Sequence, residues 1–378
     1  MWKTPSALVL IVLLLLVGGF VMLTSTSSMK ADRSFHDADY FVKRQFAWMV
    51  VAICLGFLLS NLDYHQWQRL ALPLVLISIV LLSLVFVPGI GVKVGGSRRW
   101  IRSGPVGFQP SEMAKLTTVM ALAWWMSREQ GRVSRLKEGL VLPLVILGAV
   151  AGLIFIETDL GTAVLIGAVG MVIMFLGGTR PVPLAVCALV AFLMATIYVL
   201  HNPTRMGRIL AFLDPEKYEA AAYQLVQAKD AFIMGGPWGV GFGHSLQKCL
   251  YLPEAHTDFI LPIIGEELGI VATLAITALF AGVLACGLVI SLRAPDLFGR
   301  LLGLGLTTLL TMQAAINIGV VTGLLPTKGL PLPFISYGGA SLLSSLAAVG
   351  VLLNIARHSA EEYVDVHTRI IKDRTHWI

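Results

Sequence analysis

Long apolar blocks separated by short polar segments dominate the pattern of this chain. Each block is about as long as a helix that crosses a bilayer, roughly 20 residues. Backbone polar groups in lipid must pair internally, and a closed barrel would need short alternating segments, so the blocks predict helices. About ten blocks are present, at residues 5–24, 46–61, 70–87, 111–126, 139–156, 160–176, 182–200, 262–292, 301–321 and 337–356.

The first and eighth blocks need separate interpretation. Lys3 precedes the first block, but the apolar run is long and no A-x-A cleavage pattern follows it, so we expect an uncleaved first span. The eighth block is too long for one straight span and has Gly265 and Gly269 near its start. The pattern therefore predicts an all-α polytopic membrane protein, a single integral membrane domain over residues 1–378.

Composition agrees with this class, because the 378 residues are 56% hydrophobic and only 13% charged, whereas soluble domains are about a quarter charged. An even number of spans places both termini on one side. Four basic residues in loop 127–138 and a basic C-terminal tail favour a cytoplasmic side for both. The outer loops are equally basic, which indicates either solvated surface or a site for an anionic ligand, and we favour the second.

Three outer segments are longer than simple connections: 25–45, 88–110 and 201–261. The largest lies between spans seven and eight, and long loops in compact proteins tend to be functional. Residues 219–234 of this loop predict an amphipathic helix. The glycine-dense turn 235–243 after it lacks GK[ST] and a preceding strand, so it is neither a P-loop nor a Rossmann turn.

Asp258 is the leading candidate for chemistry, because it lies at the membrane boundary just before the eighth block. A partly shielded carboxylate tends to have a raised pKa and can act as a general base. Thr257 or Asp258 could instead cap the following helix, and spacing alone slightly favours a cap. Glu254 and His256 alternate with it, and an extended segment would direct all three side chains to one side. Such a trio could hold a metal, but three residues in a row seldom suffice, so we assign no metal site.

Other charged residues cluster at the ends of predicted spans. Glu112 and Lys115 are three apart in the first turns of the fourth span, where they could neutralise each other or line a polar cavity. Asp159 lies in the tight turn between spans five and six, where Thr158 can cap the following helix. Arg98 belongs to an arginine-rich segment around Trp100, which is typical of an interfacial belt or of a phosphate-binding loop.

The run from Asn317 to Gly339 contains several prolines and glycines between two spans. Irregular backbone at membrane depth is tolerated only against protein or a wet cavity, so the run predicts a partly re-entrant segment. Its polar side chains include Lys328, Ser336 and Tyr337. On the expected topology, these basic and acidic sets meet at the outer face, an arrangement that fits a lipid-linked diphosphate.

Together these motifs resemble the SEDS family of membrane peptidoglycan glycosyltransferases over nearly the whole chain. The resemblance rests on GSRRWI (96–101), QPSEMAK (109–115), DLGT (159–162), AFLDP (211–215), LPEAHTDFI (252–260) and PFISYGG (333–339). The segment GFGHSLQK (241–248) resembles the FtsW division branch, with its sporulation relative, more than the RodA elongation branch. The chain departs from the family at residues 157–158, 261–262 and 340–341, and Glu157 places an extra charge beside Asp159.

The resemblance implies an inverting hexosyl transfer that polymerises lipid II into glycan strands on the outer face of the bacterial cytoplasmic membrane. Asp258 would deprotonate the acceptor hydroxyl, and undecaprenyl diphosphate would leave the growing, undecaprenyl diphosphate-linked glycan. Glu112 would position Lys115. The residues expected to contact the substrate are Lys115, Glu112, Arg205, Arg208, Lys248, Arg98, Asp159 and Ser336.

A class B penicillin-binding protein transpeptidase and other divisome membrane proteins are the partners that the resemblance implies, at the division septum, and nucleic acid is not among them. No cofactor is required by this reading, and a divalent cation is left open. Two other functions stay open: a flippase for the same lipid precursor and a non-catalytic divisome scaffold. A flippase would need polar residues at mid-membrane depth, whereas these residues lie near the outer ends of spans.

Overall fold

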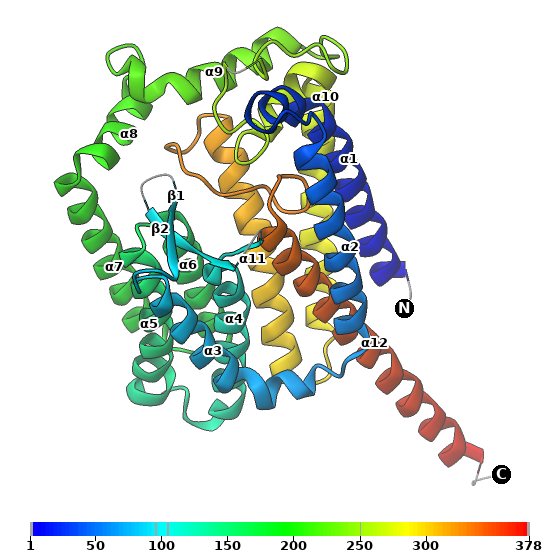
Figure 1. Ribbon diagram of the computed structural model, residues 1–378. Coiled ribbons are helices and arrows are strands. Elements are labelled where there is room, and N and C mark those ends of the chain that lie inside the picture. The colour runs from blue at the N-terminus through cyan, green and yellow to red at the C-terminus, as the bar shows by residue number, and fades with distance from the viewer. Residues whose placement is uncertain (1–2, 95–96, 104–105, 250, 376–378) are drawn as a thin grey trace.

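The computed structural model describes residues 3–94, 97–103, 106–249 and 251–375 of the chain, and it is predominantly helical (Figure 1). Eight helical segments in these residues are long and apolar enough to cross a membrane. They are α1 (Lys3–Phe35), α2 (Tyr40–Asn61), α3 (His65–Leu84), η2 (Lys137–Val141) joined to α5 (Leu142–Ile156), α7 (Pro181–His201), α10 (Ile260–Leu292), α11 (Leu297–Val321) and α12 (Gly339–Thr375).

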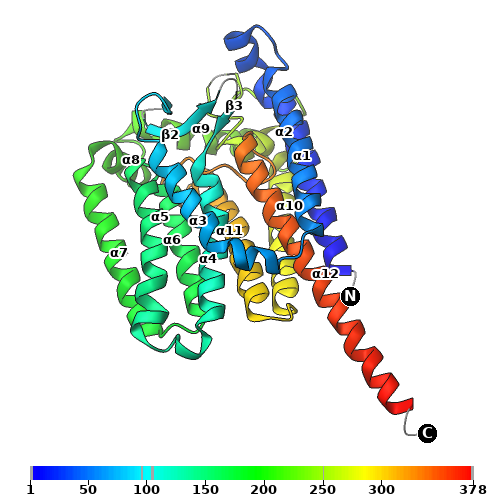
Figure 2. The same ribbon diagram turned by 60° about the horizontal axis from the view of Figure 1, so that its bottom comes forward.

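Two further helices complete the set that the hydrophobic pattern predicts. The helix α6 (Leu160–Leu176) is apolar but short, and α4 (Pro110–Arg128) carries Glu112 and Lys115 in its first turns. Each of the predicted apolar blocks thus falls mainly on a helix of its own. The two ends of the described chain lie on the side of the bundle away from the outer helix α9 (Glu219–Gly235) (Figures 1 and 2).

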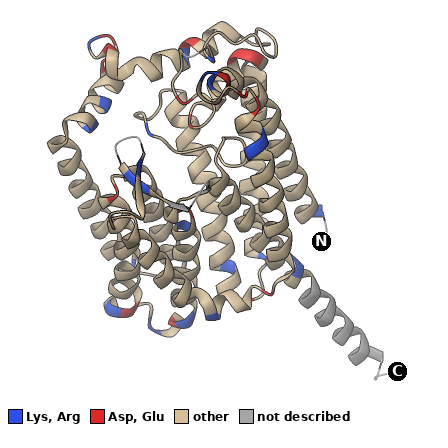
Figure 3. Ribbon diagram, in the orientation of Figure 1, with Lys and Arg blue, Asp and Glu red and all other residues tan. Residues whose placement is uncertain are grey.

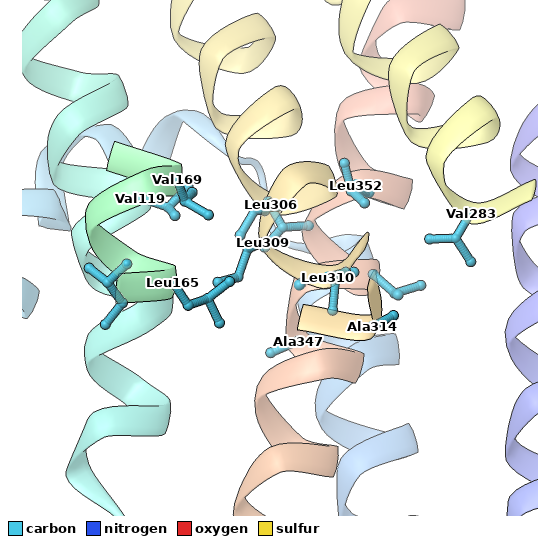
Figure 4. Close-up of a cluster of buried hydrophobic side chains, with 14 of the residues drawn as sticks. Val119, Leu165, Val169, Val283, Leu306, Leu309, Leu310, Ala314, Ala347 and Leu352 are labelled. Atoms are coloured by element: carbon cyan, nitrogen blue, oxygen red, sulfur yellow. The ribbon is translucent and has the colours of Figure 1, made fainter. Parts of the chain in front are cut away.

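The core of the bundle is built around α11, which packs against α4, α6, α10 and α12. Figure 4 shows Leu306, Leu309 and Leu310 of this helix directed toward side chains of its neighbours. Small residues allow close approach to α10, because Gly287 lies against Thr307 and Gly303 against Ser291. The helices that carry the outer motifs are therefore held by one continuous apolar core.

Helix α7 is the least buried of the candidate spans, with only 6% of its apolar window inside the protein. Its exposed side chains are apolar except for those of Thr196 and His201, which fits a lipid-facing helix. Charged residues lie mainly at the two ends of the bundle and leave its middle apolar (Figure 3). This distribution fits a chain whose middle layer is surrounded by hydrocarbon.

Segment 88–110 forms a small antiparallel sheet that the sequence pattern did not predict. Its strands are β1 (Gly91–Val94), β2 (Ser97–Ser103) and β3 (Val106–Phe108), in the order β1–β2–β3 with an irregularity between Val92 and Lys93. Gly95 and Gly96, which begin the predicted arginine-rich motif, lie outside the described residues. The sheet leads directly into α4.

The other two outer segments are more helical than expected. Much of 25–45 is not a loop, because α1 continues to Phe35 and α2 begins at Tyr40. Segment 201–261, of which Leu250 lies outside the described residues, contains α8 (Pro203–Leu213) and α9. The predicted helix 219–234 is therefore confirmed. A short helix, η1 (Gln130–Arg132), follows α4 on the opposite side of the bundle.

The helix α10 is broken at Gly269, where the backbone adopts φ 82° and ψ 175°. The glycine-dense turn fills the break: Val240 and Gly241 N–H groups donate to the Glu266 and Glu267 carbonyls, at 2.9 and 3.0 Å. A side chain at Gly239 would collide with the Glu267 carbonyl, which explains why glycine is needed there. The turn thus fixes the short first part of α10, which directly follows Asp258.

Candidate functional site

The segment 252–259 that contains Asp258 folds into consecutive turns, so the predicted extended arrangement of Glu254, His256 and Asp258 is wrong. Glu254 has φ 56° and pairs with Lys30 at 3.4 Å, while the buried His256 ring packs on Phe41. The three side chains therefore point to different partners. The described residues hold no group of three or more His, Cys, Asp or Glu that could hold a metal ion.

Asp258 lies where α10 begins, but its carboxylate makes no capping bond, since the N-cap residue of α10 is Phe259 without a side-chain cap. The carboxylate is half-buried and lies against Gly329: a Cβ atom there would be 2.6 Å from Asp258 Oδ2. The irregular segment 322–338 thus covers one side of Asp258. Asp258 is therefore not the N-cap of α10.

Asn317 and Ser336 fasten the covering segment to the Asp258 turn. Asn317 Nδ2 donates both to the Asp258 carbonyl at 2.8 Å and to the Leu330 carbonyl at 2.7 Å. Ser336 Oγ donates to the Thr257 carbonyl at 2.5 Å and accepts from the Leu332 N–H at 2.9 Å. Buried irregular backbone is paired in this way, as the re-entrant prediction requires.

Asp159 lies on the other side of the covering segment, where the adjacent Gly161 lies next to Leu330. Its Oδ1 accepts from Thr162 N–H at 3.2 Å, so Asp159, and not Thr158, caps α6. Its Oδ2 is 3.5 Å from Arg99 Nη1. The turn before α6 therefore presents an anchored carboxylate and an arginine close to the Asp258 region.

Basic side chains from three elements surround this turn. Arg99 comes from β2 and Arg205 from α8, and the Nη2 group of each donates to the Thr158 carbonyl at 3.0 Å. Lys328 of the covering segment is near Asp159, Arg205 and Arg208, and burial lowers the pKa of its ammonium group. The structure thus gathers the predicted Arg205, Arg208 and Asp159, and it adds Arg99 and Lys328.

The Asp258 carboxyl group is tuned by this environment. The pKa of Asp258 is raised to about 7, mainly by burial and also by the negative charges of Glu254 and Asp159, while Arg99 lowers it. A carboxylate with a pKa near the working pH is ionised often enough to accept a proton and basic enough to hold it. Asp258 therefore has the properties of a general base.

Unpaired buried polar atoms concentrate at the same place. Of the described side chains, eight N or O atoms are buried without a hydrogen-bond partner. Five of them belong to residues of this region: Arg99 Nε, both carboxylate oxygens of Glu157, Arg205 Nη1 and Asn317 Oδ1. Native proteins rarely leave such atoms unsatisfied, so this concentration indicates a site for a ligand.

Glu112 and Lys115 form a fully buried ion pair, with 2.9 Å between Lys115 Nζ and Glu112 Oε2. Lys115 Nζ also donates to Gln313 Oε1 at 2.8 Å, and Gln313 Nε2 donates to the Pro331 carbonyl at 2.8 Å. Ser344 donates to Glu112 at 2.6 Å. The pair is therefore neutralised, as one sequence interpretation held, and it supports the segment that covers Asp258.

Lys248 and Arg98 lie apart from the gathered residues. Lys248 Nζ is 2.8 Å from Glu267 Oε1 and donates to Ser25 Oγ at 2.8 Å, which ties the outer loop to α10 and α1. Arg98 is exposed and donates to the Phe86 carbonyl at 3.5 Å, while its neighbour Arg99 occupies the site. In this conformation Lys248 and Arg98, both predicted to contact the substrate, are bonded to other groups of the protein.

An apolar pocket adjoins the basic residues on the lipid side. It has a volume of about 460 Å³ and is lined by Phe155, Met194, Ile197, Tyr198 and His201. The guanidinium group of Arg205 lies 4.6 Å from the centre of the Tyr198 ring. A positive group therefore stands next to an apolar surface, which is the combination that an anionic lipid headgroup and its chain require.

The chain is similar to known proteins of one family. Residues 6–361 match the FtsW/RodA/SpoVE family model, described as cell cycle protein. A relative from Trichlorobacter lovleyi, named probable peptidoglycan glycosyltransferase FtsW, is 44% identical over 351 residues, 92% of each chain. Stage V sporulation protein E of Bacillus subtilis is 40% identical over 353 residues, 93% of this chain and 96% of the relative.

Solved structures show the same fold. One chain comes from work titled "Structural coordination of polymerization and crosslinking by a peptidoglycan synthase complex"; its TM-score is 0.77 at 31% identity, covering 93% of this chain and 97% of that chain. The rod shape determining protein RodA of Thermus thermophilus has a TM-score of 0.69 at 29% identity, covering 93% and 95%. The expected helical, multi-pass membrane architecture is confirmed, and the chain belongs to the FtsW/RodA/SpoVE family of cell cycle proteins.

Proposed function

We propose that this chain is a peptidoglycan glycosyltransferase that polymerises lipid II into glycan strands on the outer face of the cytoplasmic membrane. The single observation that carries this proposal is the Asp258 carboxylate, raised in pKa and placed beside a cluster of basic residues. The relatives named peptidoglycan glycosyltransferase support the same activity. One carboxylate for proton removal and several cations for a diphosphate are what this reaction needs.

In the proposed reaction, Asp258 removes the proton from the 4-hydroxyl group of the acceptor sugar. The resulting oxygen attacks the anomeric carbon of the donor chain from the face opposite the leaving group. The bond between that carbon and the diphosphate oxygen breaks, so undecaprenyl diphosphate leaves and the configuration inverts. Asp258 then carries the proton, which passes to water before the next cycle.

Negative charge develops on the departing diphosphate, and fixed cations lower the energy of such a transition state. Arg99, Arg205, Arg208 and Lys328 are the residues that we assign to this role, because they surround one turn. The apolar pocket beside Arg205 would take the start of the polyprenyl chain. To contact the substrate as expected, Lys248 would have to leave Glu267 and Arg98 would have to leave the Phe86 carbonyl.

Other predicted site residues act through their neighbours. Asp159 orients Arg99, and Ser336 holds the backbone before Asp258. The Glu112–Lys115 pair reaches the site through Gln313 and Pro331, which makes it a positioning pair.

The partner and cellular place follow from the same proposal. One structural neighbour comes from a complex whose title joins polymerisation and crosslinking, which supports a class B penicillin-binding protein as the partner of this chain. The FtsW relatives support a role at the division septum, with other divisome membrane proteins nearby. Both termini would then be cytoplasmic, and α8, α9 and Asp258 would face outward.

Purified protein in detergent, together with a transpeptidase-dead class B partner and lipid II, tests the proposal. Detergent removes the two membrane faces, so strand formation there requires catalysis and not translocation. We expect glycan strands that lengthen with time. Absence of strands under conditions in which an established polymerase makes them would contradict the proposal and favour a flippase or a scaffold.

Gly329→Ala gives a local test of how Asp258 is placed. The added methyl group would come within 2.6 Å of Asp258 Oδ2, so the carboxylate must move. A displacement of about 1 Å can cost roughly 100-fold in rate, and we expect a loss of strand formation of that order. Gly338→Ala is the matched control, because its nearest neighbour would be Ser341 at an ordinary 3.7 Å. Equal rates for the two variants would show that the Gly329 contact does not position Asp258.

A further inference from the structure

Glu157 is a buried carboxyl group to which the proposed mechanism assigns no task. The residue lies in the turn between α5 and α6 and is only 2% exposed, and neither carboxylate oxygen has a hydrogen-bond partner among the described residues. An unpaired buried carboxyl group costs free energy unless a ligand or water completes it. Because this carboxyl group lies next to the proposed substrate site, a contact with the substrate would explain why it is buried without a partner.

The turn around Glu157 is part of the Asp258 region. Thr158 has φ 68°, and its carbonyl is held by both Arg99 and Arg205. Each of these arginines also has one buried nitrogen without a partner, Arg99 Nε and Arg205 Nη1. Glu157 therefore stands among several buried polar groups of this turn that have no hydrogen-bond partner among the described residues.

Glu157 and Asp159 occupy opposite helix ends. Glu157 follows the C-terminus of α5, where the free carbonyl groups disfavour a negative charge. Asp159 caps the N-terminus of α6, where the free N–H groups favour a negative charge. Asp159 also pairs with Arg99. Two nearby carboxyl groups in such different environments are expected to take different protonation states and different roles.

From this geometry we propose that Glu157 is a specificity-determining residue that binds an uncharged hydrogen-bonding group of the lipid-linked sugar, such as a hydroxyl or acetamide group. The inference rests on the proposed function. The free guanidinium nitrogens suit the diphosphate, and an uncharged carboxyl group next to them can both donate to and accept from the sugar.

The acid–base properties of Glu157 agree with this role. The pKa of Glu157 is raised to about 8, mainly by burial and also by the charge of Asp159, while Arg99 lowers it. Arg205 reaches the same turn through the Thr158 carbonyl, and Lys328 faces Asp159. The carboxyl group is thus mostly uncharged at pH 7 and becomes charged as the pH rises through about 8. Ionisation would remove its donated hydrogen bond and bring a negative charge close to the diphosphate.

The test measures lipid II binding in the non-polymerising Asp258→Asn background, with the class B partner present, from pH 6.5 to 9.5. We expect Glu157→Ala to raise the Kd for lipid II about tenfold at pH 7, since a lost hydrogen bond to a buried group costs of that order. Glu157→Gln keeps an uncharged donor and acceptor, so its Kd stays within about twofold of the parent.

The pH dependence separates a ligand contact from a structural role. The Kd of the parent should rise above about pH 8, and that rise should be absent in Glu157→Gln. Glu216→Gln, an exposed carboxylate on the outer side, is the matched control. An unchanged Kd in Glu157→Ala, or the same alkaline rise in Glu157→Gln, would overturn the inference.

Strand formation by variants that keep Asp258 is measured in parallel. If no chain carrying Asp258 makes strands while the Kd still depends on Glu157 as described, the proposed function fails and the Glu157 contact stands. If strands form and the Kd is independent of Glu157, the contact fails and the proposed function stands.

Discussion

Asp258→Asn is expected to reduce lipid II polymerisation by roughly 100- to 10,000-fold, the usual contribution of a general base. The amide keeps the shape of the carboxylate but cannot accept the proton from the acceptor hydroxyl. The rate of strand formation by the purified complex measures the effect.

The Asp258 variant should remain folded. The side chain caps no helix, and the contacts of its backbone carbonyl with Asn317 do not depend on the carboxylate. Burial also raises the pKa of Asp258, so its ionised form does not stabilise the fold. Asp214→Asn, an exposed carboxylate on the same loop, controls for loss of a negative charge. A thermal midpoint close to wild type and more than a tenth of the wild-type rate in Asp258→Asn would refute the base assignment.

Lys115→Met is expected to destabilise the fold by about 3–5 kcal/mol, because it leaves Glu112 buried without its countercharge. Ser344 alone would then bond the Glu112 carboxylate. Thermal unfolding in detergent measures the loss. Pairing Lys115→Met with Glu112→Gln removes the uncompensated charge, so the double variant should recover most of the stability.

The same variants distinguish two roles of Lys115. A positioning role predicts that stability and activity fall together in Lys115→Met and recover together in the double variant. If Lys115→Met were as stable as wild type but lost binding of lipid II, Lys115 would be a direct ligand of the diphosphate that changes partners when substrate arrives.

Local sequence pattern was enough to predict the membrane helices, since each needs about 20 apolar residues whatever its neighbours are. Two finer predictions also follow from local physics. The long eighth block breaks at Gly269, where only glycine tolerates the backbone angles, and α9 forms where an amphipathic helix was expected. One large apolar residue of α9, Ile233, is nevertheless exposed.

The site itself could be predicted only in part, because its geometry depends on contacts between distant segments. Neighbouring side chains on a strand point to opposite faces, so the choice between Arg98 and Arg99 depends on the register of β2, which a sequence pattern does not give. Lys248 lies in the expected loop, but its ammonium group forms an ion pair with Glu267, a contact that the sequence pattern does not predict.

Two charged residues of the site, Glu157 and Lys328, stand out in the sequence, but their surroundings are not evident from it. Glu157 departs from the family pattern in the sequence, but its burial without a hydrogen-bond partner, on which its proposed role rests, appears only in the structure. Lys328 was recognised as a polar residue of the irregular segment, but its position near Asp159 and Arg205 depends on how that segment folds back. In both cases the role of a charged residue depends on which distant segments pack against its turn, and the sequence pattern does not show that packing.

The pH dependence of the strand-formation rate at saturating lipid II tests the role of Asp258 most directly. Its pKa is raised to about 7, so the ionised, proton-accepting form is present above this value and is lost as the pH falls through it. The rate should fall about tenfold for each pH unit below about 6.5, while the complex remains folded. A rate that stays constant from pH 8 to pH 5 would contradict proton removal by Asp258.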